Sequence, residues 1–174
     1  MSAGNHATSP QATSTGHAAS GAAWLDVHFA ACQPEYEAML RSAGFRPGWH
    51  LLDAGCGGGS FLPALAEEVG PSGRITALDL APENIATVEQ RLAVNVPPCP
   101  VDARVGSILA LPFPDAHFDA AWCANTSQYL DDGQLGLALA ELRRVVRPGS
   151  LVALKEFDGS AWQIASRVPG LLAR

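Results

Sequence analysis

The stretch LLDAGCGGGSF, from Leu51 to Phe61, places four glycines and a cysteine directly after two leucines and an acidic residue. Glycine weakens any helix or strand that it interrupts, so such a cluster is typical of a place where the backbone turns sharply or approaches a ligand closely. The two leucines are typical of the end of a buried strand, and FLPALAEEV (61–69) has apolar residues at helical spacing. The stretch predicts a strand, a glycine loop and a helix whose first amides can hold a polar or anionic ligand. The alternative is a surface turn without a ligand.

The composition limits the kind of protein that this chain can be. With 174 residues, of which 48% are hydrophobic, the chain has the size of one globular domain and enough apolar side chains for a core. Its formal net charge of −6 argues against a nucleic-acid-binding protein, because binding to phosphate backbones needs a clustered basic surface. We therefore expect no nucleic acid partner.

The cysteines and the amino-terminal residues indicate where the protein works. The four cysteines, at positions 32, 56, 99 and 123, have neither the CxxC spacing nor the neighbouring histidines of a zinc site, and they suggest no disulfide framework. No apolar run is long enough to span a membrane, and the amino terminus lacks the basic start and apolar stretch of a signal peptide. We expect no metal site, no membrane association and a cytoplasmic location.

The chain divides into a short tail and one domain. Residues 1–22 are almost all small or polar, so we expect them to be disordered and residues 23–174 to form the domain. After helical segments at 24–31 and 34–44, short apolar runs alternate with helical patterns. The expected strands are 50–53, 75–80, 101–105, 118–123 and 151–157, and the expected helices between them are 61–69, 82–94 and 135–146. This alternation predicts an α/β fold with a doubly wound, mostly parallel sheet.

Two polar residues follow strands that would neighbour the glycine stretch. Ligands of a doubly wound sheet bind outside the carboxyl ends of the strands, where the strand order reverses. Asp79 closes the strand ITALD about twenty residues after the glycines, where a carboxylate can bind both hydroxyls of a ribose. Ser107 lies just beyond the third strand, where it can line the wall beside a base. The pattern predicts a nucleotide-like ligand in this crevice.

Two cofactor classes use such an arrangement. NAD binding uses GxGxxG, and GCGGGS, from Gly55, provides two of the three glycines, with Ser60 in the place of the third. In DAGCGGG, by contrast, the acid stands two positions before the first glycine, and here the chain resembles the class I S-adenosylmethionine-dependent methyltransferases. The resemblance extends over roughly residues 35–158, through ITALDLAPENI, GSILALPFPDAHFDAAWCANTSQYL and LALAELRRVVRPGSLVALKEF in the family order. An NAD-dependent oxidoreductase remains the less favoured alternative.

The resemblance implies the Rossmann-like class I methyltransferase fold and a role for each residue of the glycine loop. The backbone of Gly55, Cys56 and Gly57 would approach the methionine part of S-adenosylmethionine, and Gly59 would let the loop pass close. Asp53 would orient the loop and, through water, the ammonium group. Cys56 is expected as a small residue between glycines rather than as a nucleophile, because no base partner is near it in the sequence.

The resemblance also implies contacts for the rest of the cofactor. Asp79 would bind the ribose and Leu80 would flank the adenine. Ser107 stands where many relatives have an aspartate that touches the adenine amino group, and Ile108 where a backbone amide meets the ring. Ala124 would offer its carbonyl to the methionine end. Alternatively, Asp79 merely caps the following helix, and the same alternative holds for the acid before the glycines.

The expected activity is methyl transfer to oxygen or carbon of a small, largely apolar metabolite, as in the similar quinone-biosynthesis and natural-product methyltransferases. The main task of such an enzyme is to hold acceptor and methyl group in line and to exclude water. If the acceptor is a hydroxyl or an acidic carbon, a base accelerates the reaction. The candidate catalytic residues are His28, Tyr36, Gln128 and Glu156.

The carboxyl-terminal part departs from the family pattern. The family sheet normally continues with two more strands, whereas only DGSAWQIASRVPGLLAR follows the fifth strand. We expect a sheet without the last two strands, with the fifth strand as an apolar edge, and thus either a truncated chain or a partner, in a homo-oligomer or from another subunit, that covers this edge. A non-catalytic S-adenosylmethionine-binding module, or an incomplete subunit that needs a partner, is therefore the alternative function.

Overall fold

The computed structural model describes residues 21–156 of the chain. The predicted tail lies outside this range except for its last two residues, and the segment that follows residue 156 also lies outside it. The division into a tail and a domain of residues 23–174 therefore stays a prediction.

A single five-stranded sheet organises the described residues, with all strands parallel in the order β3-β2-β1-β4-β5. The strands are β1 (His50–Ala54), β2 (Arg74–Asp79), β3 (Val101–Val105), β4 (Phe118–Ala124) and β5 (Val146–Lys155). The strand order reverses between β1 and β4, because the chain winds outward on one side of β1 first and then on the other. The predicted doubly wound α/β class is confirmed.

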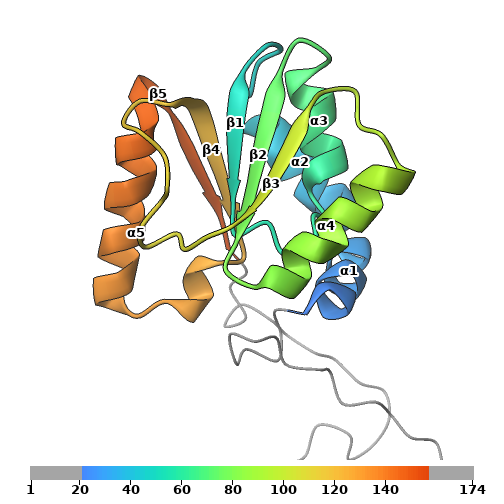
Figure 1. Cartoon of the computed structure of the whole chain (residues 1–174), viewed down its shortest axis with the longest axis horizontal. Helices are drawn as coiled ribbons and strands as arrows, with labels where there is room; N and C mark the ends of the chain where they lie inside the picture. Colours follow the sequence, from blue (N-terminus) through green and yellow to red (C-terminus); the bar gives the residue numbers. More distant parts are fainter. Residues whose placement is uncertain (1–20, 157–174) are drawn as a thin grey trace, which may run out of the picture.

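Helices cover both faces of this sheet (Figure 1). On one face lie α1 (Ala22–Ala31), α2 (Gln33–Ser42), α3 (Leu62–Val69) and α4 (Pro82–Val94), and on the other lies α5 (Asp132–Val145). A short 3₁₀ helix, η2 (Ser127–Tyr129), connects β4 toward α5. None of the helices in residues 21–156 is long and apolar enough to cross a membrane.

The alternation of side chains along β1 divides the core into two layers. Leu51 packs into the layer formed with α2, α3 and α4, whereas Leu52 packs into the layer formed with α5, and both leucines are fully buried. Because successive side chains of a strand point to opposite faces, a central strand that is covered on both sides is apolar throughout. Asp53 interrupts this apolar pattern, because it is a polar residue that is buried in the same strand.

Two element boundaries differ from the prediction near the carboxyl end. The last helix begins at Asp132 rather than at 135, because Asp131 caps it: its carboxylate accepts from the Gln134 amide, and the Gln134 side chain accepts from the Asp131 amide. The last strand begins at Val146, directly after the helix, and a register shift opposite β4 accommodates the Pro-Gly turn. Such local irregularities are not visible in hydrophobic periodicity.

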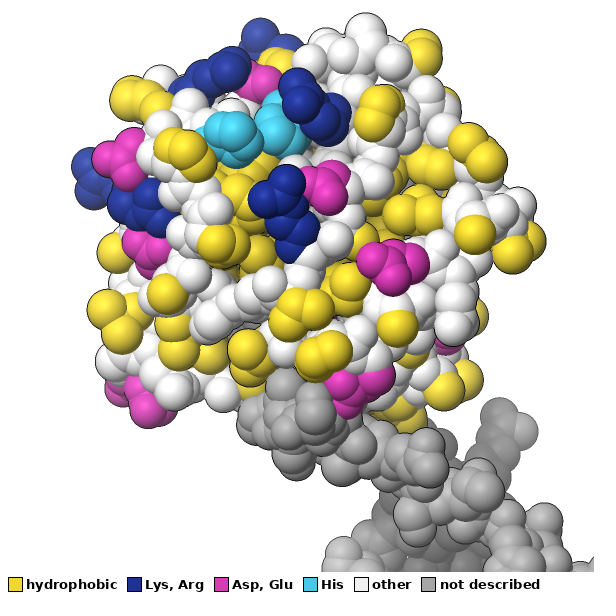
Figure 2. Space-filling model, viewed as in Figure 1, with side chains coloured by type: hydrophobic (Ala, Val, Ile, Leu, Met, Phe, Trp, Pro, Cys, Tyr) yellow, Lys and Arg dark blue, Asp and Glu magenta, His cyan; other side chains and the backbone are white. Residues whose placement is uncertain are grey.

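Two histidines lie at the end of the sheet away from the glycine loop. Figure 2 shows two neighbouring histidine side chains bordered by basic ones, and the His50 and His117 rings are 5.1 Å apart. The His50 ring is also 3.0 Å from the Thr76 hydroxyl. Burial, assisted by the nearby Arg74, lowers the pKa of His50 to about 4. His50 is therefore a neutral packing residue at the start of β1.

Candidate functional site

The glycine loop is tied to the neighbouring strand by backbone hydrogen bonds. The amides of Gly55 and Cys56 both donate to the carbonyl of Leu78, at 2.7 and 3.0 Å. Gly55 has a φ of +78°, and a Cβ at this position would lie 2.2 Å from the Thr126 hydroxyl oxygen. Only glycine fits this turn, because an added side chain would meet both backbone strain and the chain that follows β4.

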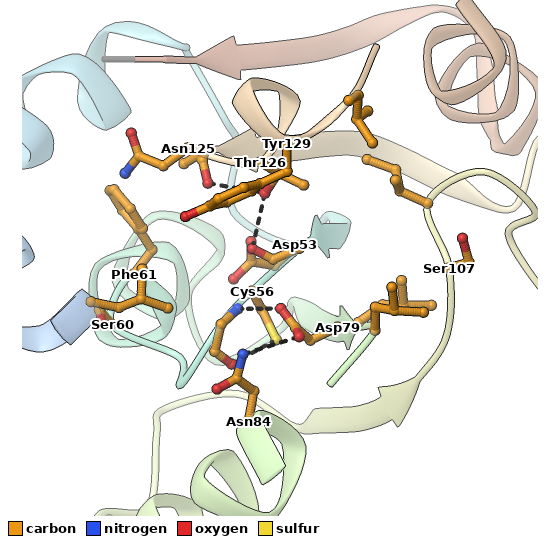
Figure 3. Close-up of a pocket in the computed structure, with 18 of the residues that line it drawn as sticks. Asp53, Cys56, Ser60, Phe61, Asp79, Asn84, Ser107, Asn125, Thr126 and Tyr129 are labelled. Carbon is orange, nitrogen blue, oxygen red and sulfur yellow. Dashed lines mark hydrogen bonds between the residues drawn. The ribbon is translucent and has the colours of Figure 1, made fainter. Parts of the chain in front are cut away.

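Asp79, at the end of β2, is the second attachment of the loop. One carboxylate oxygen accepts from the Gly57 amide at 2.8 Å, and the other accepts from the Ala81 amide at 2.9 Å and from the Asn84 side chain at 3.1 Å. A carboxylate has about four acceptor positions, so these three donors leave capacity for a ligand. The sequence predicted the position of Asp79 but not Asn84, whose buried amide orients the carboxylate (Figure 3).

Asp53 is the electrostatically exceptional residue of the site. Its side chain is only 2% exposed, and within residues 21–156 its Oδ2 atom has no hydrogen-bond partner. Burial, and then repulsion by the Asp79 carboxylate, raise the pKa of Asp53 to about 8. The group is therefore mainly protonated at neutral pH, and it will ionise readily only if a cation arrives beside it.

A cavity of about 230 Å³ opens beside these groups. Of the ten predicted cofactor-binding residues, nine line it: Asp53, Gly55, Cys56, Gly57, Asp79, Leu80, Ser107, Ile108 and Ala124. Gly59 does not line it. It has a positive φ and packs closely against Leu62 and Val88 instead. Figure 3 shows Ser107 and Phe61 on opposite sides of the view, with Asp53 and Asp79 between them. The two acidic residues therefore lie between the parts of the lining that Ser107 and Phe61 mark.

Helix α1 forms a wall over the glycine loop. Leu25 packs so closely that a Cβ on Gly57 would lie 2.5 Å from its Cδ1 atom. Asp26 pairs with Arg91 of α4 and accepts from the Ser60 hydroxyl at 3.0 Å, and Arg91 also donates to the Gly58 carbonyl at 2.8 Å. These contacts were not predictable from sequence patterns, because they join residues more than thirty positions apart.

Two of the four candidate catalytic residues meet at the cavity, and two do not. His28 and Tyr36 both line it, with the tyrosine oxygen 3.4 and 3.5 Å from the two imidazole nitrogens. Gln128 donates to the Asn125 carbonyl at 2.9 Å, and Glu156 accepts from the amides that begin η2. Neither Gln128 nor Glu156 is among the described residues that line the cavity.

The protonation of the lining groups limits their chemistry. Burial raises the pKa of Tyr36 to about 12, so the phenol is a hydrogen-bond donor at neutral pH. Burial, followed by the positive charge of Lys155, lowers the pKa of His28, so this imidazole is mainly neutral and can accept a proton. Burial raises the pKa of the Cys56 thiol well above its ordinary value. Cys56 therefore lacks the thiolate form that a nucleophilic cysteine needs.

The Gly55 turn gives a direct test of the loop geometry. Gly55→Ala should lower the free energy of unfolding by about 2 kcal/mol or more, because the new methyl group combines backbone strain with a clash against Thr126. Urea unfolding measures this loss. In the background of Thr126→Ala the loss should be smaller, whereas Gly136→Ala, in an open position of α5, should not destabilise the protein. Equal losses in both backgrounds would contradict the clash.

Comparison with known proteins identifies the family of this site. Residues 51–149, which include the glycine loop and the strand ends around it, match the family of the methyltransferase domain. The chain is 38% identical over 135 residues to a malonyl-[acyl-carrier protein] O-methyltransferase of Serratia marcescens, covering 73% of this chain and 48% of that protein. It is 35% identical over 122 residues to a ubiquinone/menaquinone biosynthesis C-methyltransferase of Cupriavidus necator, covering 68% and 47%.

A solved structure gives the same result. The crystal structure of a SAM-dependent methyltransferase from Aquifex aeolicus superposes with a TM-score of 0.60 at 29% identity, over 68% of this chain and 61% of that one. The chain spans about half the length of the curated methyltransferases that it matches. The sheet that carries the site has the Rossmann-like class I methyltransferase fold. With the match over residues 51–149, this shows that the chain belongs to the methyltransferase domain family.

Proposed function

We propose that the chain is an S-adenosylmethionine-dependent methyltransferase that acts on oxygen or carbon of a small, largely apolar metabolite. The observation that carries the proposal is the buried carboxyl group of Asp53, whose Oδ2 atom has no hydrogen-bond partner within residues 21–156 and which lines a cavity beside the Asp79 carboxylate. A buried carboxyl group without a partner is costly, and a cationic ligand compensates that cost. S-adenosylmethionine carries both a cationic end and a ribose.

The residues of the cavity fit the parts of this cofactor. Asp53 would pair with its ammonium group, and the spare acceptor capacity of Asp79 would receive the ribose hydroxyls. Leu80, which is 57% exposed at the cavity, and Ile108 would cover the flat base. Ser107 would remain a weak polar contact, because its hydroxyl accepts from the Leu109 amide at 3.2 Å.

When bound, S-adenosylmethionine supplies a methyl group on a positively charged sulfur. The residues of the chain then have to bind, orient and exclude water. The acceptor would lie at the end of the cavity that Phe61 lines, and Leu25 and Tyr129 add further apolar surface to the lining. The neutral imidazole of His28 can take the proton that a hydroxyl or acidic carbon must lose. Alignment and desolvation are thus the main contributions of this site.

The acceptor end favours a flat apolar molecule. Aromatic rings line it in mutual contact: Phe29 and Phe61 meet edge to face at 4.8 Å, and Tyr36 stacks on Phe61 at 5.6 Å. Rings of this kind bury large apolar area and prefer flat partners. The relatives named for quinone biosynthesis agree with such an acceptor.

The first experiment is calorimetric titration of the full chain with S-adenosylmethionine, S-adenosylhomocysteine and NAD. We expect binding of the first two only. Asp79→Ala should weaken that binding about 10- to 100-fold, because it removes acceptors of charge-assisted hydrogen bonds. Asp102→Ala, which removes an exposed carboxylate of β3, is the matched control and should bind normally.

The outcomes of this titration separate the alternatives. Absence of S-adenosylmethionine binding by the wild type contradicts the proposed function, and NAD binding instead would favour an oxidoreductase. Binding without release of S-adenosylhomocysteine, in a screen of phenols and quinones, would favour the non-catalytic module or incomplete subunit. Unchanged affinity of Asp79→Ala would remove the ribose assignment.

The protonated state of Asp53 predicts proton release on binding. The pKa of about 8 leaves Asp53 protonated at pH 7 in the free protein, and a cation beside it favours the ionised form. We expect wild type to release up to about one more proton per bound S-adenosylmethionine than Asp53→Asn does. Calorimetry at pH 7 in buffers of different ionisation enthalpy measures the difference. Any proton exchange by the ligand itself is common to both proteins, so equal release by both would contradict the pairing.

The same pKa gives the direction of a stability change. Because the folded pKa of Asp53 lies above its unfolded value, the folded free protein binds more protons between about pH 4 and 8, and its stability falls as the pH rises through that window. In Asp53→Asn, the part of this stability loss that is due to Asp53 should be absent. The pH dependence of urea unfolding in the absence of ligand provides the measurement.

We also propose that a partner chain, or a second copy, pairs with β5. This strand is an edge of the described sheet and carries Leu154 with 44% of its surface exposed. Light scattering should give a mass above that of the monomer, and Leu154→Lys should reduce it, whereas Leu137→Lys, an exposed position of α5, should not. A monomeric wild type would contradict pairing between copies.

The four free cysteines agree with a cytoplasmic protein, which fractionation of expressing cells would test.

A further inference from the structure

A buried lysine lies directly behind the acceptor end of the cavity. Lys155 is the last residue of β5 and is only 5% exposed. Its ammonium group donates to the Asn125 side chain at 2.5 Å and lies 3.5 Å from the centre of the Tyr36 ring. Both of these partners line the cavity, whereas Lys155 is not part of the lining. The charge of Lys155 therefore acts on the cavity from behind these two side chains.

The charge of Lys155 is not neutralised by an ion pair in the described part of the chain. Within residues 21–156, no carboxylate oxygen lies within 4.0 Å of its ammonium group. The adjacent Glu156 directs its carboxylate to the amides of Thr126 and Ser127, at 3.1 and 2.8 Å. A buried cation held by an amide and an aromatic face is costlier to keep than a paired one, so a role limited to packing does not explain it.

Tyr36 connects this cation to His28. The face of the tyrosine ring receives the Lys155 ammonium, and its hydroxyl lies 3.4 Å from Nε2 of His28. Trp24 stacks on His28 with ring centres 6.4 Å apart, which restrains the imidazole further. The result is an array of Lys155, Tyr36 and His28 that runs from the back of the cavity wall to the cavity itself.

We propose that Lys155 is a positioning residue of the acceptor end: its fixed positive charge behind the Tyr36 ring favours the neutral imidazole at His28. The identity of the acceptor rests on the proposed function, whereas the effect of the Lys155 charge on His28 does not. The other titratable groups near the array are Cys32, at the junction of α1 and α2, Tyr129 of η2 and Glu156. The negative charge of Glu156 would favour the imidazolium, so Lys155 has to outweigh it.

The protonation of the array agrees with this arrangement. Burial is the largest cause that lowers the pKa of His28, and Lys155 is the charge that adds to it. Burial lowers the pKa of Lys155 itself to about 8, so the ammonium is mainly charged at neutral pH. Tyr36 keeps its proton, since burial raises its pKa to about 12. Its hydroxyl oxygen can accept from the N–H of the neutral imidazole, which leaves the other ring nitrogen of His28 free to take a proton.

The array implies an acceptor that loses a proton when it is methylated. The acceptor's O–H or acidic C–H bond breaks, and its proton goes to an imidazole nitrogen of His28. The electron pair left on the oxygen or carbon forms the bond to the methyl carbon, while the methyl–sulfur bond breaks and its electron pair stays on sulfur. The imidazolium then returns its proton to water. A positive charge nearby both favours the neutral base beforehand and stabilises the acceptor anion.

The test is a titration of His28 in the full-length free protein, followed by nuclear magnetic resonance of the imidazole carbon–hydrogen signals. His28→Gln assigns the signal. In Lys155→Met the titration midpoint of His28 should rise by roughly half a pH unit relative to wild type, because a buried charge is weakly screened. Arg41→Gln, which removes an exposed charge from α2, is the matched control and should leave the midpoint unchanged. The range of about pH 4 to 7 keeps Lys155 charged.

A second neutral variant keeps the test decisive if Lys155→Met does not fold. Lys155→Gln also removes the charge but retains a donor toward Asn125, and its His28 midpoint should rise in the same way. Lys155→Arg, which retains the charge, should keep the midpoint low. No rise in either neutral variant, or an equal rise in Arg41→Gln, would overturn the proposal. Because the titration needs no cofactor, it is independent of whether S-adenosylmethionine binds.

Activity provides the second readout once an acceptor is known. In Lys155→Met the acid limb of the pH profile of kcat/KM should move to higher pH together with the His28 midpoint. A lower rate with an unmoved acid limb would indicate a packing role only and would overturn the proposal.

Discussion

The hydrogen bond from the Gly57 amide to the Asp79 carboxylate is the interaction on which the geometry of this site depends. With the two amides that donate to the Leu78 carbonyl, it fixes the glycine loop against the end of β2. The same carboxylate repels Asp53 on the neighbouring strand. Asp79 thus positions bare backbone at the cavity and also adds to the effect of burial, which already disfavours the ionised form of Asp53.

Charges of opposite sign lie at two places around the cavity. The Asp79 carboxylate, beside the buried Asp53, is negative, whereas Lys155 places a positive charge behind the wall near His28. A cationic cofactor and an acceptor that becomes anionic would each meet the complementary charge, which would orient both without a direct hydrogen bond to the reacting atoms. In a low-dielectric cavity, such fixed charges act more strongly than they do in water.

Much of the fold and part of the site were predictable from the sequence, because their signals are local. The glycine stretch identifies Gly55 by a backbone requirement that few other residues meet, and the strand ITALD identifies Asp79 as a carboxylate at a strand end. Thr126, Asn84 and Lys155 were not predictable in this way. Thr126 matters because it fills the space above Gly55, and Lys155 because β5 pairs beside β4, and neither relation leaves a periodic pattern in the chain.

The two sides of the cavity also differ in how firmly the fold holds them. The cofactor side is built on β1 and β2, whose side chains are nearly all buried, whereas α1 has no fully buried residue and is held to the loop through Asp26 and Leu25. Segments with few buried contacts open at lower free energy than the core does. Substitutions at His28 or Phe29 can therefore change this side of the cavity with little effect on the sheet. Under the proposed function, this separation would allow one rigid cofactor site to serve different acceptors.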